Sequence, residues 1–373
     1  MEQPTRVLIV DDSKVFRSIL EKIIAAIPDV QVIGGVGKGS EALEFLRMRT
    51  VDLMTLDVEM PDMNGVETLQ KMIEQKATFK AMPGVLMISS LTRTGSDITL
   101  KSLELGAFDF VAKPGANMQN AQEHLNRMLR SAITAWKTKR NLGANRIRAV
   151  PPPGGGTVPA SAPPPAGFSY SLAPSPHTKQ IMAIVLGVST GGPKSLAEML
   201  PKLCTATNLP ILLVQHMPPN FTKSLADSLA AKCKHNVVEG APGMVVQQKC
   251  VYIAPGGYHM TVRTRGADYV LETNQDPPEN GCRPSVDVLF RSAARAYPQD
   301  SLIGIILTGM GNDGTPSLSE MKRKSAYLIA QDEETSVVFG MPRAAAATGL
   351  LDKVASLTNI PDAVLERIHM VKR

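Results

Sequence analysis

The chain has 373 residues, 43% of them hydrophobic and 20% charged, a balance that excludes a wholly disordered, collagen-like or coiled-coil protein. Its four cysteines contain no CxxC pair and are too sparse for a disulfide scaffold or a zinc ribbon. The N-terminus lacks the apolar run of a signal peptide, and no stretch of about 18 apolar residues occurs. We therefore expect a cytoplasmic protein without membrane insertion.

The net charge of +6 is unevenly distributed along the chain. Residues 1–136 carry 15 basic and 17 acidic side chains, whereas residues 137–178 carry five basic and no acidic ones. Ten of the sixteen residues from 151 to 166 are Pro or Gly, a composition typical of an extended linker. We interpret the basic residues before it as a solvated helix end, with a contact to nucleic acid or to a receptor tail as the alternative. The expected organisation is two domains and a flexible, Pro-rich linker: residues 1–137, 179–373 and 138–178.

Short apolar runs alternate with helical patterns in the first domain. Four of these runs have the length of buried strands: residues 7–10, 53–56, 85–88 and 108–111. A helix after the first run is expected to place Val15, Ile19, Ile23 and Ile27 on one face and to end before Pro28. Strands that alternate with helices predict a doubly wound α/β domain with a parallel sheet.

Polar side chains follow each of these predicted strands. Asp11 and Asp12 follow the first, Asp57 the second, Ser89 the third and Lys113 the fourth. Ligands of such sheets bind beyond the carboxyl ends of the strands, so the five side chains should converge. The carboxylates suit Mg²⁺, and one of them can accept a phosphoryl group that the hydroxyl and the ammonium then contact. A single Asp after a strand is commonly a helix N-cap, but the shared register favours a phosphoryl site.

The first domain resembles the receiver domains of response regulators, which have a flavodoxin-like fold. The matching segments are LIVDDS at 8–13, TLDVEMPDMNG at 55–65, ISSLT at 88–92 and GAFDFVAKP at 106–114. The resemblance implies that a histidine kinase phosphorylates Asp57. It also implies that Mg²⁺ is held by a set of oxygen ligands: Asp11, Asp12, Asp57 and the backbone carbonyl of Glu59. The implied sensing and switch positions are Ser89, Lys113 and Phe110.

The second domain begins with a strand, a Gly-rich turn and a helix in the segment IMAIVLGVSTGGPKSL at 181–196. Gly187-x-Ser189-x-Gly191 fits a nucleophile elbow, which exposes a serine at the tip of a strand. A Walker A loop is excluded because Pro193 interrupts the required GK[ST] sequence. The GxSxG match alone is also typical of a plain structural turn.

A serine nucleophile needs a base and a group that orients the base. His216 follows the next apolar run, and Asp313 lies in the loop TGMGNDG that follows a third run. The tips of these strands should bring Ser189, His216 and Asp313 together, and the amide of Met310 could contribute to an oxyanion hole. A capping or core role for His216 is the alternative when this residue is considered alone.

The order Ser, His, Asp is neither that of chymotrypsin nor that of the α/β-hydrolases. The second domain instead resembles the catalytic domain of the chemotaxis protein-glutamate methylesterases, the CheB family, in which a receiver also comes first. The matching segments are GVSTGGPKSL at 187–196, LVQHMPPNFT at 213–222, YIAPGGYHM at 252–260, RPSVDVLF at 283–290, ILTGMGNDG at 306–314 and VVFGMPRAA at 337–345. The resemblance implies an α/β methylesterase domain with a mainly parallel sheet.

The resemblance implies that Ser189 is the nucleophile, His216 the general base and acid, and Asp313 its orienting partner. Met310 would supply an oxyanion-hole amide, and Thr190 would line the site. The implied activity is phosphorylation-activated hydrolysis of glutamyl methyl esters on chemoreceptors, with methanol released during chemotaxis adaptation. Deamidation of receptor glutamines is a possible second activity. The implied partners are methyl-accepting chemoreceptors as substrates and a chemotaxis histidine kinase as phosphodonor, with no cofactor for the esterase step.

The sequence leaves two other interpretations. A response regulator that binds DNA through its second domain is supported by the positive net charge. However, residues 179–373 carry 20 basic and 17 acidic side chains and no helix-turn-helix pattern, so no nucleic-acid partner is expected. A methylesterase-like module that acts on other signalling proteins stays open. The linker is longer and richer in Pro than is usual in the family, which predicts looser docking of the two domains.

Overall fold

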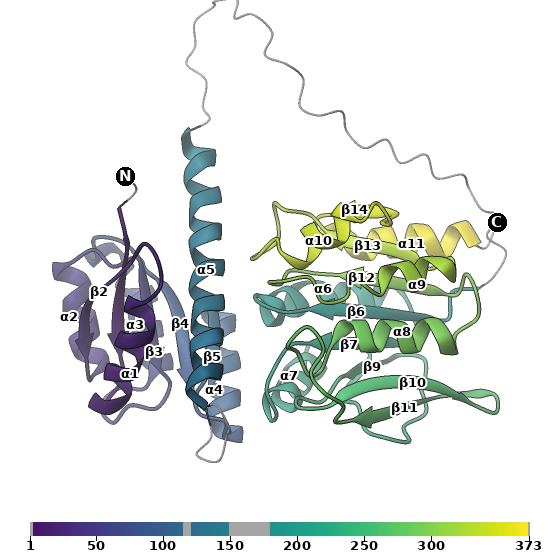
Figure 1. The fold of residues 1–373 in the computed structure, drawn as a ribbon, viewed down its shortest axis with the longest axis horizontal. Helices are drawn as coiled ribbons and strands as arrows, with labels where there is room; N and C mark the ends of the chain where they lie inside the picture. The colour runs from purple at the N-terminus through teal and green to yellow at the C-terminus, as the bar shows by residue number, and fades with distance from the viewer. Residues whose placement is uncertain (1–2, 115–120, 149–179, 372–373) are drawn as a thin grey trace, which may run out of the picture.

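The apolar runs of the sequence form the strands of two separate α/β lobes, which lie side by side (Figure 1). The computed structural model describes residues 3–114, 121–148 and 180–371. The elements of the first lobe are β1 (Thr5–Val10), α1 (Lys14–Ala25), β2 (Val30–Val36), α2 (Gly39–Met48), β3 (Leu53–Asp57), α3 (Gly65–Glu74), β4 (Gly84–Ser89), α4 (Arg93–Leu105), β5 (Asp109–Ala112) and α5 (Ala121–Arg148).

The sheet of the first lobe has five parallel strands in the order β2-β1-β3-β4-β5. This is the order of flavodoxin-like folds, so the predicted doubly wound architecture is confirmed. The four predicted strands are β1, β3, β4 and β5. Helices pack on both faces of the sheet, which is why β3 is buried along its whole length.

The first helix begins directly after the two acidic residues at the tip of β1. The Ser13 hydroxyl accepts a hydrogen bond from Phe16 N and caps the start of α1, so Asp11 and Asp12 stay at the strand end. Val15 was expected on the apolar face of this helix but is 73% exposed. Side chains four residues apart drift by about 40° around a helix, which turns Val15 away from the face that packs on the sheet.

Helix α5 includes the basic residues that the sequence analysis interprets as a helix end, but it extends past the predicted domain boundary at residue 137. It runs to Arg148, so residues 138–148, which were assigned to the linker, are helical. Residues 149–179 lie outside the described residues, and the flexible linker therefore stays a prediction. Within the described parts of the chain, no helix combines the length and the apolarity needed to cross a bilayer.

The second lobe contains a larger sheet and a separate hairpin. Its elements are β6 (Ala183–Val188), α6 (Gly192–Ala206), β7 (Ile211–Gln215), α7 (Phe221–Ala230), β8 (Asn236–Glu239), β9 (Cys250–Ile253), β10 (His259–Arg265), β11 (Asp268–Asn274), α8 (Val286–Ala296), β12 (Leu302–Ile306), α9 (Leu318–Arg323), β13 (Tyr327–Gln331), α10 (Met341–Ala347), β14 (Lys353–Ala355) and α11 (Ile360–Val371).

The larger sheet has seven parallel strands in the order β14-β13-β12-β6-β7-β9-β8. The expected mainly parallel sheet is confirmed, and the antiparallel hairpin β10–β11 was not predicted. The chain leaves β6 toward β7 on one side and returns to β12 on its other side. A sheet binds its ligands beyond such a switch point, so the site is expected at the carboxyl ends of β12, β6 and β7.

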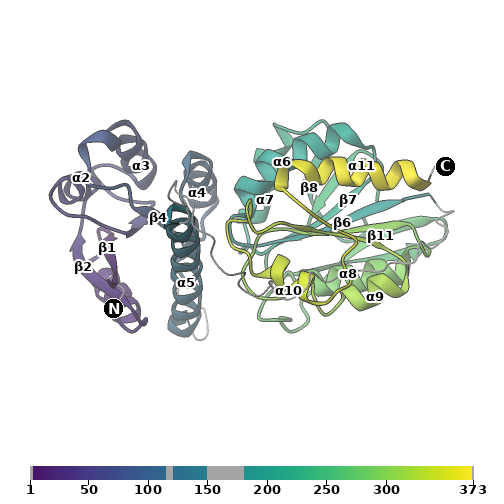
Figure 2. The same cartoon turned by 90° about the horizontal axis from the view of Figure 1, so that it is seen from above.

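The two lobes contact each other through helices α4 and α5 of the first lobe (Figure 2). The ring of Phe110 stacks on that of Phe221, with a centroid distance of 4.6 Å and an interplanar angle of 13°. The hydroxyls of Ser96 in α4 and Ser224 in α7 form a buried hydrogen bond of 2.7 Å. These contacts place the first lobe against the carboxyl ends of the second sheet.

Candidate functional site

Three carboxylates and a lysine meet at the carboxyl ends of the strands in the first lobe. Oxygen atoms of Asp11, Asp12 and Asp57 lie within 4.8 Å of one another. Lys113 Nζ lies 2.7 Å from Asp57 Oδ2 and 3.0 Å from Asp11 Oδ2. Burial raises the pKa of Asp57 to about 6, although the Lys113 ammonium opposes this effect. The predicted convergence of these four side chains is therefore present.

The donor atoms of this cluster fit a hard divalent cation. Asp11 Oδ2 is buried, and its partner among the described residues is the Lys113 ammonium, which forms an ion pair with it. Glu59 N donates to Asp57 Oδ1 at 3.3 Å, which holds the backbone of Glu59 beside the carboxylates. An all-oxygen set of this kind suits Mg²⁺, the ion that the receiver resemblance implies.

Two of the predicted sensing residues do not join this cluster. The Ser89 hydroxyl donates to the backbone oxygens of Ser90 and Gly95, each at 3.2 Å, and it has no hydrogen bond to Asp57. Phe110 points into the contact between the lobes, where it meets Phe221. Because local carbonyls and a ring in the other lobe satisfy these side chains, both would have to reorient to respond to a phosphoryl group.

A second cluster lies at the carboxyl ends of the middle strands of the larger sheet. Ser189 follows β6 and His216 follows β7, and the two strands are paired along their length. Ser189 N donates to Thr308 O at 3.0 Å, and His216 N donates to Val188 O at 3.1 Å. These backbone bonds bring the predicted serine and histidine to the same edge, beside the loop that carries Asp313.

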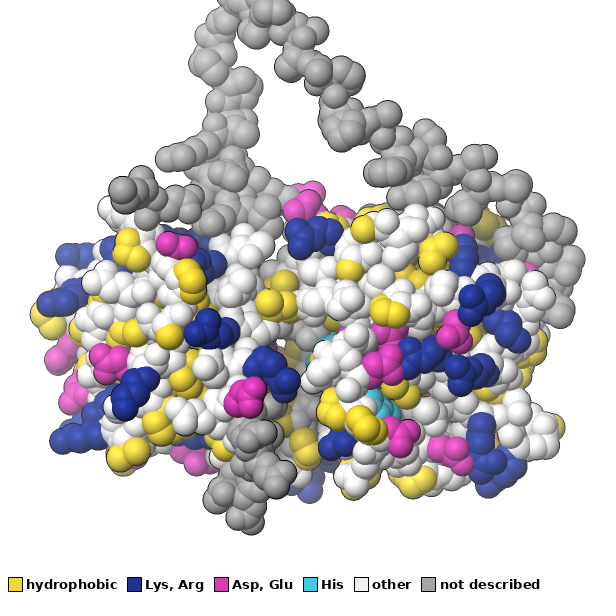
Figure 3. All heavy atoms as spheres, in the orientation of Figure 1, with side chains coloured by type: hydrophobic (Ala, Val, Ile, Leu, Met, Phe, Trp, Pro, Cys, Tyr) yellow, Lys and Arg dark blue, Asp and Glu magenta, His cyan; other side chains and the backbone are white. Residues whose placement is uncertain are grey.

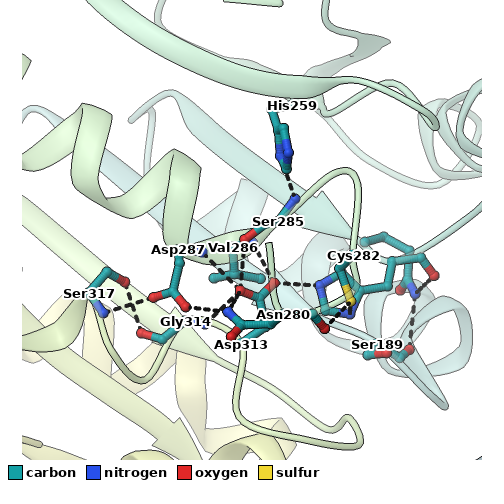
Figure 4. Close-up of polar contacts among 12 residues, drawn as sticks. Ser189, His259, Asn280, Cys282, Ser285, Val286, Asp287, Asp313, Gly314 and Ser317 are labelled. Atoms are coloured by element: carbon teal, nitrogen blue, oxygen red, sulfur yellow. Dashed lines mark hydrogen bonds and ion pairs between the residues drawn. The ribbon is translucent and has the colours of Figure 1, made fainter. Parts of the chain in front are cut away.

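The carboxylate of Asp313 accepts hydrogen bonds from several surrounding groups (Figure 4). Besides His216, five groups donate to its carboxylate at 2.7–3.2 Å: Asn280 Nδ2, Ser285 Oγ, Val286 N, Asp287 N and Gly314 N. The backbone donors at 286 and 287 belong to the first turn of α8, where a negative charge is stabilised. Burial alone would raise the pKa of Asp313, but the hydrogen bond from His216 and these donors hold it well below its usual range.

His216 uses its two ring nitrogens differently. Nε2 lies 2.7 Å from Asp313 Oδ2, whereas Nδ1 lies 3.6 Å from Cys282 Sγ. No hydrogen bond joins the ring to Ser189 Oγ among the described residues, so this triad is assembled only in part. Burial opposes the charged imidazolium, but Cys282 and the bonded Asp313 outweigh burial and raise the pKa of His216 above its ordinary value.

The surroundings of Ser189 leave backbone donors free for a ligand. Within the described residues, neither Thr190 N nor Met310 N has an intramolecular acceptor. Gly309 allows the loop to approach closely, because a Cβ there would lie 2.7 Å from Ser189 Cβ. Gln215 Nε2 donates to the carbonyl oxygen of Ser189 at 3.0 Å and so fixes the turn. The free amides can hydrogen-bond to an oxyanion that forms beside the serine.

Several residues of this site were missed by reasoning from the sequence. Gln215, Asn280, Cys282 and Ser285 contact the three predicted residues, although they had no predicted role. Ser285 lies in the segment RPSVDVLF, which has no sequence signal besides its resemblance to the family. The pair Asn280-Gly281 is a turn signal from which a tight loop at this point of the chain could have been predicted.

Both lobes match known families. A family model described as a response regulator receiver domain matches residues 7–126, and one described as CheB methylesterase matches residues 184–364. A protein-glutamate methylesterase/protein-glutamine glutaminase of Desulfotalea psychrophila is 41% identical over 98% of each chain. A protein of the same name from Pyrococcus abyssi is 38% identical over 98% of this chain and 94% of its own.

A crystal structure of the Thermotoga maritima CheB methylesterase catalytic domain is 39% identical in sequence. It covers 50% of this chain and 99% of its own, with a TM-score of 0.49. The whole-chain identity to the two curated relatives decides the classification. The chain belongs to the family of protein-glutamate methylesterases in which a response regulator receiver domain precedes a CheB methylesterase domain.

Proposed function

We propose that the protein is a phosphorylation-activated methylesterase that hydrolyses glutamyl methyl esters on chemoreceptors and releases methanol. The observation that carries this proposal is the hydrogen-bonded pair of His216 and Asp313 at the same sheet edge as Ser189, in a chain of the methylesterase family. The names of the curated relatives include protein-glutamine glutaminase. We therefore include deamidation of receptor glutamines by the same site in the proposal.

In the first step, Ser189 Oγ attacks the side-chain carbonyl carbon of the methylated glutamate while its proton passes to His216. Because Nε2 is bonded to Asp313, Nδ1 is the nitrogen that takes this proton. The amides of Thr190 and Met310 stabilise the oxyanion. Methanol then leaves with the proton from the imidazolium, and the glutamyl group stays as an ester on Ser189. To reach Nδ1, the serine hydroxyl must replace the thiol that faces this nitrogen in the structure.

In the second step, His216 takes a proton from water, and the resulting hydroxide attacks the acyl carbon of the ester. Ser189 leaves with the proton that His216 returns, which gives the free glutamate side chain. Asp313 stays ionised throughout because its pKa is lowered, and it stabilises the imidazolium that forms twice in the cycle.

The first lobe is proposed to be the regulator, with a histidine kinase as phosphodonor and Asp57 as acceptor. Asp11, Asp12, Asp57 and the backbone carbonyl of Glu59 would hold Mg²⁺, which when bound offsets the negative charge of the phosphoryl oxygens. Lys113 already contacts Asp57 and would transfer its hydrogen bond to the phosphoryl group.

Contacts between the lobes support a direct effect of the receiver on the serine. Burial raises the pKa of Asp109 in β5, and the Thr190 side chain, next to Ser189, lies close enough to its carboxylate to oppose this rise. Ser131 in α5 donates to Met310 Sδ at 2.8 Å. The receiver therefore contacts both of the residues whose amides are proposed to stabilise the oxyanion. We propose that the unphosphorylated receiver holds the site closed to the receptor and that phosphorylation favours the undocked state.

The charge distribution gives no support to a DNA-binding function. On the face shown in Figure 3, Lys and Arg side chains are interspersed with Asp and Glu on both lobes. A protein that binds DNA through its second domain would be expected to gather basic side chains on one surface.

The covalent step can be tested by trapping the intermediate. The full chain is mixed with methylated receptor membranes, quenched in acid after a short time, digested and analysed by tandem mass spectrometry. We expect a glutamyl adduct on Ser189, and none at this position in a Ser189→Ala variant. An adduct on another residue, with normal methanol release by the variant, would overturn the proposal.

A further inference from the structure

We propose that His216 and Cys282 form a binding site for Zn²⁺ and that the bound ion silences the esterase. Ligand atoms of these two residues and of Asp313 lie within 4.8 Å of one another. The inference rests on the proposed function where it concerns inhibition, but the metal site itself can be tested without any substrate.

The distance between the two ligand atoms suits a tetrahedral ion. With Zn–N near 2.0 Å and Zn–S near 2.3 Å, a tetrahedral angle separates the nitrogen and the sulfur by about 3.5 Å. His216 Nδ1 and Cys282 Sγ are 3.6 Å apart. An ion can therefore bridge them without rearrangement of the backbone.

The hydrogen bond to Asp313 prepares the imidazole for a metal. Because Nε2 donates to the Asp313 carboxylate, the lone pair of the neutral ring lies on Nδ1, which is the nitrogen that faces Cys282. A carboxylate behind a ligating histidine orients the ring and increases its basicity, as in many zinc sites. The thiol would release its proton to solvent when the ion binds, because the thiolate is the ligand.

A rigid turn presents the thiol to the histidine. Glu279 and Cys282 exchange backbone hydrogen bonds of 3.1 and 2.9 Å. Asn280 and Gly281 between them have positive φ values of 52° and 74°. Both ligands are accessible to solvent, since the His216 side chain is 12% exposed and Cys282 is only partly buried. The remaining coordination positions can be filled by water.

Occupation of this site blocks the proposed reaction. The lone pair of His216 Nδ1 is the one that must accept the proton of Ser189, so a bound ion removes the base. Mg²⁺ should not have this effect, because it prefers the all-oxygen cluster of the receiver to a nitrogen–sulfur pair. The two lobes would thus respond to two different metal ions.

The site can be examined with Co²⁺ as a spectroscopic substitute for Zn²⁺ in the full-length protein. Cobalt bound to a thiolate gives a near-ultraviolet charge-transfer absorption, which we expect in the wild type and in a Cys233→Ala control. We expect Cys282→Ala to lose this absorption. An absorption of equal intensity in Cys282→Ala would overturn the proposal.

Inhibition is measured as methanol release by the phosphorylated protein in Zn²⁺ titrations at constant Mg²⁺, with a phosphine reductant present. Relative to its own metal-free rate, Cys282→Ala should need at least about tenfold more Zn²⁺ than wild type for half inhibition. Cys233→Ala should match wild type, and a chelator should restore activity. Equal sensitivity of all three proteins, or inhibition that a chelator cannot reverse, would reject the site. Methanol release by Ser189→Ala would contradict the proposed function. The cobalt absorption would be unaffected by that result, so the two proposals can fail independently.

Discussion

Removal of the hydrogen bond between Ser96 and Ser224 should weaken the docking of the two lobes by a small amount. The Ser96 hydroxyl also lies 2.7 Å from the carbonyl oxygen of Arg93, to which it donates, so the Ser224 hydroxyl is the donor across the contact. Both side chains are buried. Loss of one such bond costs about 0.5–1.5 kcal/mol, which shifts an equilibrium between docked and undocked lobes by about two- to twelvefold.

Ser224→Ala should therefore raise the rate of methanol release by the unphosphorylated chain by about two- to twelvefold. The phosphorylated chain, in which we propose that the lobes are undocked, should be unaffected. The double variant Ser96→Ala/Ser224→Ala should match Ser224→Ala, because the Ser96 hydroxyl keeps its hydrogen bond to the Arg93 carbonyl in the single variant and is not left as an unpaired donor. An unchanged basal rate, or an equal increase with and without phosphate, would refute the idea that this contact holds the site closed.

Three further predictions concern the receiver and the serine turn. Gly309→Ala should lower the turnover number at least tenfold with an unchanged circular dichroism spectrum, because the new Cβ displaces Ser189. Burial raises the pKa of Asp109 to about 6 in the docked state, so protonation favours docking. The measured quantity is the ratio of the unphosphorylated to the phosphorylated rate of methanol release. This ratio should be lowest at low pH and should increase as the pH rises through about 6, and Asp109→Asn should make it less dependent on pH. Asp57→Asn should not be labelled by radioactive acetyl phosphate, and labelling of wild type should vanish in EDTA; labelling that persists would contradict the metal role.

The positions of the predicted site residues could be read from the sequence because each follows a buried apolar run. Parallel strands bring their carboxyl ends to one edge, so Ser189, His216 and Asp313 had to lie near one another once the sheet was predicted. The same reasoning placed Asp57 beside Lys113. The sequence pattern does not predict the orientation of the side chains, such as which ring nitrogen of His216 faces Asp313.

The residues around Asp313 could not be predicted because tertiary packing brings them there. Asn280 and Cys282 lie in a turn between the hairpin β10–β11 and α8, and they reach the sheet edge only because α8 packs against β10. The hairpin was itself missed, since its strands are partly exposed and lack a continuous apolar run. The basic residues before the Pro-rich stretch are interpreted correctly as a helix end, but the boundary of the first domain is placed at residue 137, eleven residues before α5 ends at Arg148.

The most direct test of the central claim is methanol release from methylated receptor membranes by four preparations of the full chain. These are wild type and Ser189→Ala, each with and without phosphorylation of Asp57. We expect a low rate for unphosphorylated wild type, a clear increase on phosphorylation, and no release by Ser189→Ala in either state. Release by Ser189→Ala at the same rate as wild type would contradict serine catalysis. An equal rate of release by wild type with and without phosphorylation would contradict control by the receiver.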